Sequence, residues 1–143
     1  MKNQAWALKL LRESRVAHLA TSREGRLHVI PICYVLDRNR IYSSIDEKPK
    51  RVIDSHLRRV LNINSNPRVV LIADFYSEDW DRLQYVIVEG LAKMLRSGRE
   101  HKYAVNLLRR KYKQYRSMQI QGRPIIRIRL GKLVAWRSSA LQK

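Results

Sequence analysis

The sequence predicts a mainly β protein with a few helices, forming a single domain over residues 1–143. Three observations support this prediction. Six segments have the character of strands, several of them joined by short turns, and three others repeat their apolar residues at helical spacing. A chain of this length has the usual size of one domain. Because strands joined by short hairpins pair antiparallel, we expect an α+β fold: a six-stranded antiparallel barrel whose ends or openings are covered by helices.

The chain begins with a predicted helix and a buried strand. Residues 4–13 place Ala5, Leu8 and Leu11 at three-residue steps, which is typical of a short amphipathic helix. Residues 15–21 are small or apolar on both sides of an alternating pattern. This pattern indicates a strand that is buried on both faces.

Two more strands follow, separated by turns at residues 22–25 and 37–39. The strand at residues 27–36 is rich in β-branched residues but contains Pro31. Since proline has no N–H for a β-ladder, Pro31 marks an edge, a bulge or a place where a ligand replaces a neighbouring strand. Residues 40–45 form the third strand of this meander.

The middle of the chain changes period and then returns to strands. Residues 50–64 repeat apolar side chains at three- and four-residue steps, which predicts a helix that the Asn-Pro pair at 66–67 ends. Residues 68–76 are strongly β-prone, and residues 83–95 alternate clearly. We expect an acidic connection between these two strands.

The last third contains one helix and one strand. Residues 97–115 form the helix, beginning at a Ser-Gly pair, and residues 124–136 alternate apolar and basic side chains as a half-buried strand does. The core face of this helix is predicted to carry Tyr103, Leu107, Leu108 and Tyr112.

Composition excludes several classes of protein. No apolar stretch approaches the roughly 20 residues of a membrane-spanning helix, and no signal-peptide core is found near the first residue, so we expect a cytoplasmic protein. The lone Cys33 predicts neither an internal disulfide nor a thiolate metal site. The formal net charge of +18 is unusual. It indicates an anionic partner or, alternatively, a solvated basic surface with no specific partner.

The segment at residues 41–51 has the groups that a phosphate monoester needs. A strand ends in the hydroxyls of Ser43 and Ser44, and a short loop then leads to Lys48, Lys50 and Arg51 at the start of a predicted helix. Hydroxyls, ammonium and guanidinium groups and helix N-terminal amides all bind phosphate. The alternative interpretation is a solvated connection with a few basic residues.

Several motifs, taken in their order along the chain, resemble the pyridoxamine-5′-phosphate-oxidase-like split barrels that bind FMN, and most closely the branch that uses the deazaflavin coenzyme F420. No single motif is decisive; their order is what matters. The matching segments are residues 15–21, 28–33, 46–51, 57–59, 62–63, 66–69, 79–80, 86–92, 112–115 and 126–128.

The resemblance implies a six-stranded antiparallel split β-barrel that forms a homodimer, with flavin or deazaflavin in a groove between the subunits. It implies that Ser43, Ser44, Lys48, Lys50 and Arg51 hold the cofactor phosphate. Pro31, Ile32 and Cys33 would then lie along the ring of the cofactor.

Other candidate residues are weaker. Trp80 lies within an acidic run and is included among the cofactor-binding candidates. We expect it to pack over a groove or a partner chain, because an exposed tryptophan is costly in water. His18 lies in an apolar strand and is interpreted as a core histidine. The remaining histidines and the carboxylates at 78–81 lack metal-ligand spacing, so no metal site is expected. The family needs no protein nucleophile, and catalytic residues stay unassigned.

Function is predicted as an oxidoreductase that transfers hydride between coenzyme F420, or alternatively FMN, and an unidentified small-molecule substrate. Two alternatives stay open: a non-catalytic flavin- or haem-binding module, and a basic nucleic-acid-binding protein. Nucleic acid is not expected as a partner, because the tyrosines in the basic run at 99–116 match the core spacing and leave no exposed aromatic among the bases. That basic run could instead attract the anionic oligoglutamate tail of coenzyme F420.

Overall fold

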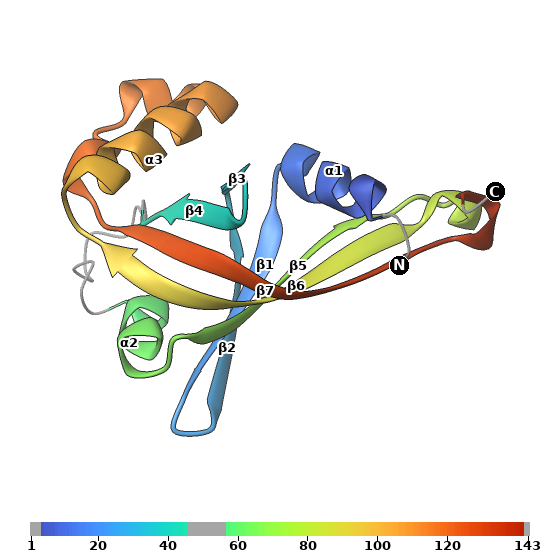
Figure 1. The fold of residues 1–143 in the computed structure, drawn as a ribbon, viewed down its shortest axis with the longest axis horizontal. Helices are drawn as coiled ribbons and strands as arrows, with labels where there is room; N and C mark the ends of the chain where they lie inside the picture. The colour runs from blue at the N-terminus through green and yellow to red at the C-terminus, as the bar shows by residue number, and fades with distance from the viewer. Residues whose placement is uncertain (1–3, 46–56, 142–143) are drawn as a thin grey trace.

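The computed structural model describes residues 4–45 and 57–141. Within these residues the fold has three α-helices and seven strands, together with short 3₁₀ turns (Figure 1). The strands are β1 (Ala17–Arg23), β2 (Arg26–Ile32), β3 (Val35–Asp37), β4 (Arg40–Ser44), β5 (Arg68–Phe75), β6 (Gln84–Leu95) and β7 (Ile125–Arg137). The helices are α1 (Ala5–Glu13), α2 (Arg58–Ser65) and α3 (Arg99–Lys111). The 3₁₀ turns are η2 (Trp80–Arg82), η3 (Lys113–Ser117), η4 (Ile120–Gly122) and η5 (Ser139–Leu141).

All seven strands belong to one antiparallel sheet in the order β2-β1-β5-β6-β7-β4-β3. Its two edge strands, β2 and β3, are separated in sequence by only Cys33 and Tyr34. The sheet must therefore curl until its edges nearly meet, yet no ladder joins β2 to β3 in the described part of the chain. The result is an open barrel with a split between β2 and β3, which confirms the predicted fold class.

The strand count corrects the sequence-based prediction of six. The predicted strand at 27–36 is two strands, because the chain leaves one edge of the sheet at Ile32 and joins the other at Val35. The other five predicted strands appear with ends shifted by a few residues. In the described part of the helix predicted at 50–64, the first helical residue is Arg58; residues 46–56 lie outside the described residues.

Two groups of buried side chains stabilise the fold. The larger one fills the inside of the curled sheet and includes Leu19, Leu71 and Val88, with Ala7 and Leu11 of α1 over one opening. The smaller one packs α3 against β4 and β7. In this second group Ala104, Val105 and Leu108 face the sheet.

Tyr103 is not a core residue, contrary to the prediction from spacing: its side chain is 44% exposed. The buried positions of α3 begin at His101 and continue through Ala104 and Val105. The buried face of α3 therefore includes the positions just after Tyr103 in place of Tyr103 itself. Ala104 and Val105 pack against the sheet where the sequence predicted the tyrosine ring.

The bulge between Val88 and Gly90 brings β6 very close to β7. A Cβ atom on Gly90 would lie 2.6 Å from the Cγ2 atom of Ile128 and 2.7 Å from the carbonyl oxygen of Arg129. The Gly90→Ala variant is expected to lose about 1–3 kcal/mol of unfolding free energy, as overpacked sites do. Chemical denaturation measures this loss. Gly122→Ala is the control, because its Cβ would meet no atom within 4 Å, and an equal loss in both variants would contradict the prediction.

None of the helices in the described ranges is long and apolar enough to cross a membrane.

Candidate functional site

A hollow of about 230 Å³ opens beside the split between β2 and β3, between the end of β2 and the end of β4. Its lining comprises Val16, Pro31, Ile32, Cys33, Ser43, Ser44 and Arg59. Five of these residues were singled out from the sequence as cofactor-binding candidates: two serines of β4, the last two residues of β2, and Cys33, which follows them. The structure brings these five together. Lys48, Lys50 and Arg51, the remaining phosphate candidates, lie outside the described residues.

The two serines have different roles in this hollow. Ser43 Oγ donates a hydrogen bond of 2.7 Å to the carbonyl oxygen of Cys33, so its proton is used within the protein. Ser44 Oγ is buried and has no hydrogen-bond partner among the described residues. Leaving a buried hydroxyl unpaired costs about 1–3 kcal/mol. The Ser44 hydroxyl is therefore the group that a bound ligand would stabilise.

Arg59 supplies the positive charge of the hollow, and sequence reasoning missed it. The residue is only 5% exposed and lies in the first turn of α2. A guanidinium beside a hydroxyl is a suitable donor pair for phosphate or carboxylate. The signal in the sequence was the spacing of Arg59, Asn62 and Ile63, which places all three on the buried side of α2.

The positive potential of α2 also reaches β2. The pKa of His28 is lowered first by burial and then by repulsion from Arg58 and Arg59. These two arginines therefore act together on the edge of the sheet that borders the hollow. An anion bound here would relieve that repulsion.

The wall of the hollow is fixed by Tyr112 at the end of α3. Its hydroxyl accepts a hydrogen bond from the Tyr34 N–H at 3.0 Å and lies 2.7 Å from the Arg15 carbonyl and 3.0 Å from the Tyr34 carbonyl. Because Tyr34 lies in the gap between two strands, its backbone has no ladder partner, and the tyrosine hydroxyl takes that place. Burial raises the pKa of Tyr112 to about 12, so the hydroxyl keeps its proton near neutral pH.

Lys111 lies next to this wall. Its Nζ atom donates to the Ser14 carbonyl at 2.7 Å and lies 4.3 Å from the centre of the Tyr34 ring. Burial, followed by repulsion from Arg15, lowers its pKa to about 8, with Cys33 acting in the opposite direction. Lys111 therefore titrates just above neutral pH in the folded protein.

This titration predicts a pH-dependent stability. The unfolded chain keeps the Lys111 proton up to about pH 10.5, whereas the folded chain releases it near pH 8. Between these values the unfolded state binds more protons, so the free energy of unfolding should rise with pH. In urea titrations at pH 7.5 and 9.5, wild type should gain stability relative to Lys111→Met at the higher pH. A difference between the two proteins that does not change with pH would contradict this.

Trp80 does not line the hollow. It lies in η2, just before β6 begins, and 67% of its surface is exposed. Its Nε1 atom is 3.4 Å from the Tyr76 hydroxyl, which is itself exposed. The expectation that Trp80 packs on a partner chain stays a prediction.

Histidines and carboxylates add no metal centre in the parts of the chain that the structure describes. His18 faces outward from β1 and is exposed, which corrects its assignment to the core: the residues of β1 on either side of it, Ala17 and Leu19, point inward instead. Among the described histidines, His101 is the buried one, with its Nε2 atom 2.7 Å from the Arg123 carbonyl oxygen.

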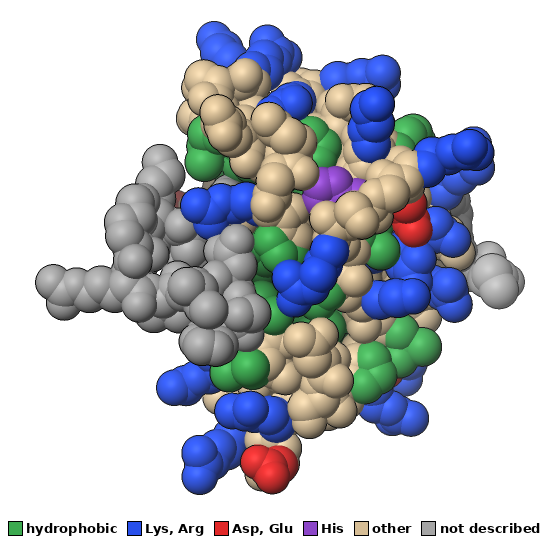
Figure 2. Space-filling view, turned by 90° about the vertical axis from the view of Figure 1, so that its left-hand side faces the viewer, with side chains coloured by type: hydrophobic (Ala, Val, Ile, Leu, Met, Phe, Trp, Pro, Cys, Tyr) green, Lys and Arg blue, Asp and Glu red, His purple; other side chains and the backbone are tan. Residues whose placement is uncertain are grey.

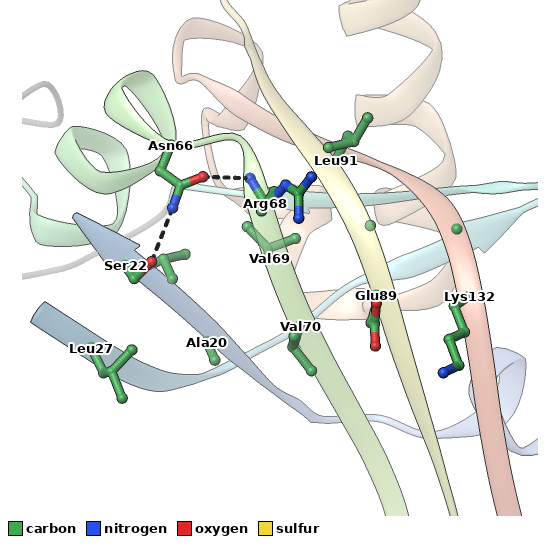
Figure 3. Close-up of a pocket in the computed structure, with 13 residues that line it drawn as sticks. Ala20, Ser22, Leu27, Asn66, Arg68, Val69, Val70, Glu89, Leu91 and Lys132 are labelled. Atoms are coloured by element: carbon green, nitrogen blue, oxygen red, sulfur yellow. Dashed lines mark hydrogen bonds between the residues drawn. The ribbon is translucent and has the colours of Figure 1, made fainter. Parts of the chain in front are cut away.

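The outer face of the sheet carries a second hollow, of about 590 Å³, across β1, β2, β5, β6 and β7 (Figure 3). Asn66 braces one end of it with hydrogen bonds of 3.1 Å to the Ser22 hydroxyl and from the Arg68 N–H. Large apolar side chains stand exposed on the outer face, and we call them the apolar sheet face: Leu27, Val29, Val70, Leu91, Val134 and Trp136. A patch of this kind commonly marks an interaction site.

Comparisons with known proteins agree with this fold. The family model described as pyridoxamine 5′-phosphate oxidase matches residues 3–135. No curated protein matches the sequence. Among solved structures, an FAD-binding protein from Mesorhizobium loti has a TM-score of 0.73 at 19% identity, covering 94% of this chain and 92% of its own.

Two further structures show the same fold. HutZ, described as the heme storage protein from Vibrio cholerae, has a TM-score of 0.72 at 14% identity and covers 96% of this chain and 95% of its own. A protein described as an F420 reductase has a TM-score of 0.65 at 19% identity, with 88% and 94% covered. Together with the family model, which spans nearly the whole sequence, they lead to one conclusion. The chain belongs to the pyridoxamine 5′-phosphate oxidase family.

Proposed function

We propose that this protein is an oxidoreductase that binds coenzyme F420, or alternatively FMN, with the cofactor phosphate in the hollow at the β2–β3 split. The observation that carries the proposal is the buried Ser44 hydroxyl, which has no partner among the described residues and lies in the same hollow as Arg59. A neutral donor and a permanent cation are the groups that an anionic phosphate requires. The family resemblance implies that Lys48, Lys50 and Arg51 contact the same phosphate.

The size of the hollow fits part of such a cofactor. Complete ligand pockets usually measure about 300–1,000 Å³, and this one measures about 230 Å³. It suits the phosphate end, while the ring would extend past Pro31 and Cys33 towards the open side. A second protein surface is then needed to cover the ring.

That surface is proposed to come from a second copy of the chain. The apolar sheet face includes Leu27 and Val29, with 80% and 61% of their surfaces exposed, on the strand that also lines the hollow. A two-fold symmetric dimer would bury this face against itself and place residues of the partner over the cofactor site. Homodimerisation and cofactor binding are therefore linked in this proposal.

The chemistry of the reaction belongs to the cofactor, which when bound carries a hydride to or from a small-molecule substrate. The chain's own residues bind and orient. Arg59 and Ser44 would hold the phosphate, and the backbone of residues 31–33 would fix the plane in which the ring lies. Tyr112 keeps that backbone in place through Tyr34.

Charge favours coenzyme F420 over FMN in this proposal, because a net charge of +18 far exceeds what one phosphate can neutralise. Binding of coenzyme F420, with its oligoglutamate tail, should weaken steeply as salt rises, since distant charges are screened within about 8–10 Å. FMN should show a shallower dependence, because its phosphate is partly enclosed. Paired absorbance titrations at low and high salt measure both slopes, and parallel slopes would contradict a role for the tail.

A binding module without turnover is the second candidate, and the fold shared with the heme storage protein HutZ favours it. The visible spectrum of the purified protein separates the possibilities. A bound flavin or deazaflavin whose reduced form an added electron acceptor reoxidises faster on the protein than in free solution supports the oxidoreductase. A haem band, or no bound chromophore with either titrated cofactor, would overturn it.

A further inference from the structure

Charge is distributed very unevenly along this chain. Residues 91–141 contain fourteen Lys and Arg residues and a single acidic residue, Glu100. Glu78, Asp79 and Asp81 lie instead around η2, at the end of the molecule away from α3 (Figure 1). Viewed towards the α3 end, the surface shows many Lys and Arg side chains and few acidic ones (Figure 2). The α3 end of the molecule is therefore rich in positive charge.

The solvent side of α3 forms a continuous basic stripe. Six residues, spaced three or four positions apart along α3 and into η3, are exposed, and none of them is acidic. We call them the basic face: Arg99, Lys102, Tyr103, Asn106, Arg110 and Lys113. The opposite side of α3 is buried through Ala104, Val105 and Leu108. The basic face is thus a fixed surface on a helix that the core holds in place.

Among the described residues, no carboxylate forms a salt bridge with Arg99, Lys102, Arg110 or Lys113. Glu100 is already shared between Arg40, at 2.6 Å, and Arg127, at 2.9 Å. Arg109 donates instead to the carbonyl oxygens of Tyr115 and Met118. A carbonyl accepts a hydrogen bond but leaves the cationic charge in place. A polyanion from outside is what would neutralise it.

Tyr103 places an exposed aromatic ring among the basic side chains of the basic face. Its hydroxyl donates to Asp37 at 3.0 Å, which holds the exposed ring against the β3–β4 turn. That hydrogen bond raises the pKa of Tyr103, while the charges of Arg38 and Arg110 act to lower it. The spacing of the tyrosines in this segment predicted buried rings, which would leave no aromatic surface for a nucleobase, but the Tyr103 ring is exposed.

We propose that the basic face of α3 binds single-stranded nucleic acid. The phosphates would contact Arg99, Lys102, Arg110 and Lys113, and a base would stack on Tyr103. A membrane surface fits less well, because a helix that lies on lipid presents a broad apolar face, whereas the apolar side chains of α3 point into the core. The basic face shares no residue with the lining of the proposed cofactor hollow.

A fluorescence-anisotropy titration of the full chain with labelled 20-nucleotide oligo-U RNA tests the proposal. The slope of log affinity against log salt should be about −0.7 per neutralised phosphate, and so about −3 for four contacts. The Lys102→Glu/Arg110→Glu variant should bind at least tenfold more weakly, with the slope reduced by about half. Tyr103→Ala should lose roughly tenfold, while Tyr103→Phe, which keeps the ring, should bind as wild type does.

The matched control is Arg26→Glu/Arg82→Glu, which removes the same charge from exposed positions outside the basic face. Retained RNA affinity in this control supports a defined site, and an equal loss in both double variants would overturn it in favour of overall charge. Three further results would also overturn the proposal: no binding at 50 mM salt, equal affinity for duplex DNA, or displacement of RNA by oligoglutamate of the same total charge. Thermal melting confirms that each variant is folded.

Discussion

Replacing Arg59 by methionine is expected to weaken the binding of FMN and coenzyme F420 by about 10- to 150-fold. This range corresponds to the roughly 1.5–3 kcal/mol of a hydrogen bond to a charged group. Arg59 is the charged residue that the structure places in the hollow at the β2–β3 split, and it is almost completely buried there. Methionine keeps much of its length and packing while removing the guanidinium. Absorbance or fluorescence titration of each cofactor measures the effect.

Arg58 provides a matched control, because it is the neighbouring residue of the same helix but is exposed. Arg58→Met removes the same charge from solvent and should cost at most about fivefold, as screened surface charges do. Ser44→Ala should weaken binding, whereas Ser43→Ala should mainly release the Cys33 carbonyl. Equal losses for Arg58→Met and Arg59→Met, with both variants folded, would show that the phosphate lies elsewhere.

Much of the fold follows from local patterns that tertiary contacts do not override. Alternation in β6 and β7 predicted both strands, and the β-branched run of β5 predicted the third member of the central sheet. The break after Ile32 was not predicted, because nothing local distinguishes a continuous strand from one that leaves one sheet edge and joins the other. The strand breaks there because the sheet curls until its two edges nearly meet, and that curling depends on strands that are distant in sequence.

The candidate site was predicted only in part, because some of its residues are marked by local motifs and others are placed by contacts that are distant in sequence. Ser43, Ser44 and the segment around Pro31 are close in sequence to recognisable turns, so a motif could locate them. Arg59 was missed because arginine in an amphipathic helix is normally a solvent residue. Its burial depends on where α2 begins and how it packs against β1. Tyr103 shows the opposite error, since large aromatic side chains suggest a core face even where smaller neighbours occupy it.

The Val70→Asp variant is expected to separate the proposed homodimer and to abolish cofactor binding at micromolar protein. Val70 lies on β5 in the middle of the apolar sheet face and is 41% exposed in the single chain. Burying a valine contributes about 1.5–3 kcal/mol, and a two-fold interface contains the substituted residue twice. An unpaired carboxylate in the interface adds a further penalty. The dimer dissociation constant should therefore rise by at least about a hundredfold.

Light scattering combined with cofactor titration tests this link. Asn106→Asp is the control, because it places the same new charge on exposed α3, away from the sheet. A wild-type protein that is monomeric at micromolar concentration would contradict the dimer. If Val70→Asp is monomeric yet binds FMN with wild-type affinity, one chain completes the site alone, and the small volume of the hollow no longer implies a partner. If dimerisation and binding are lost together, the second copy supplies the cover that a hollow of about 230 Å³ lacks.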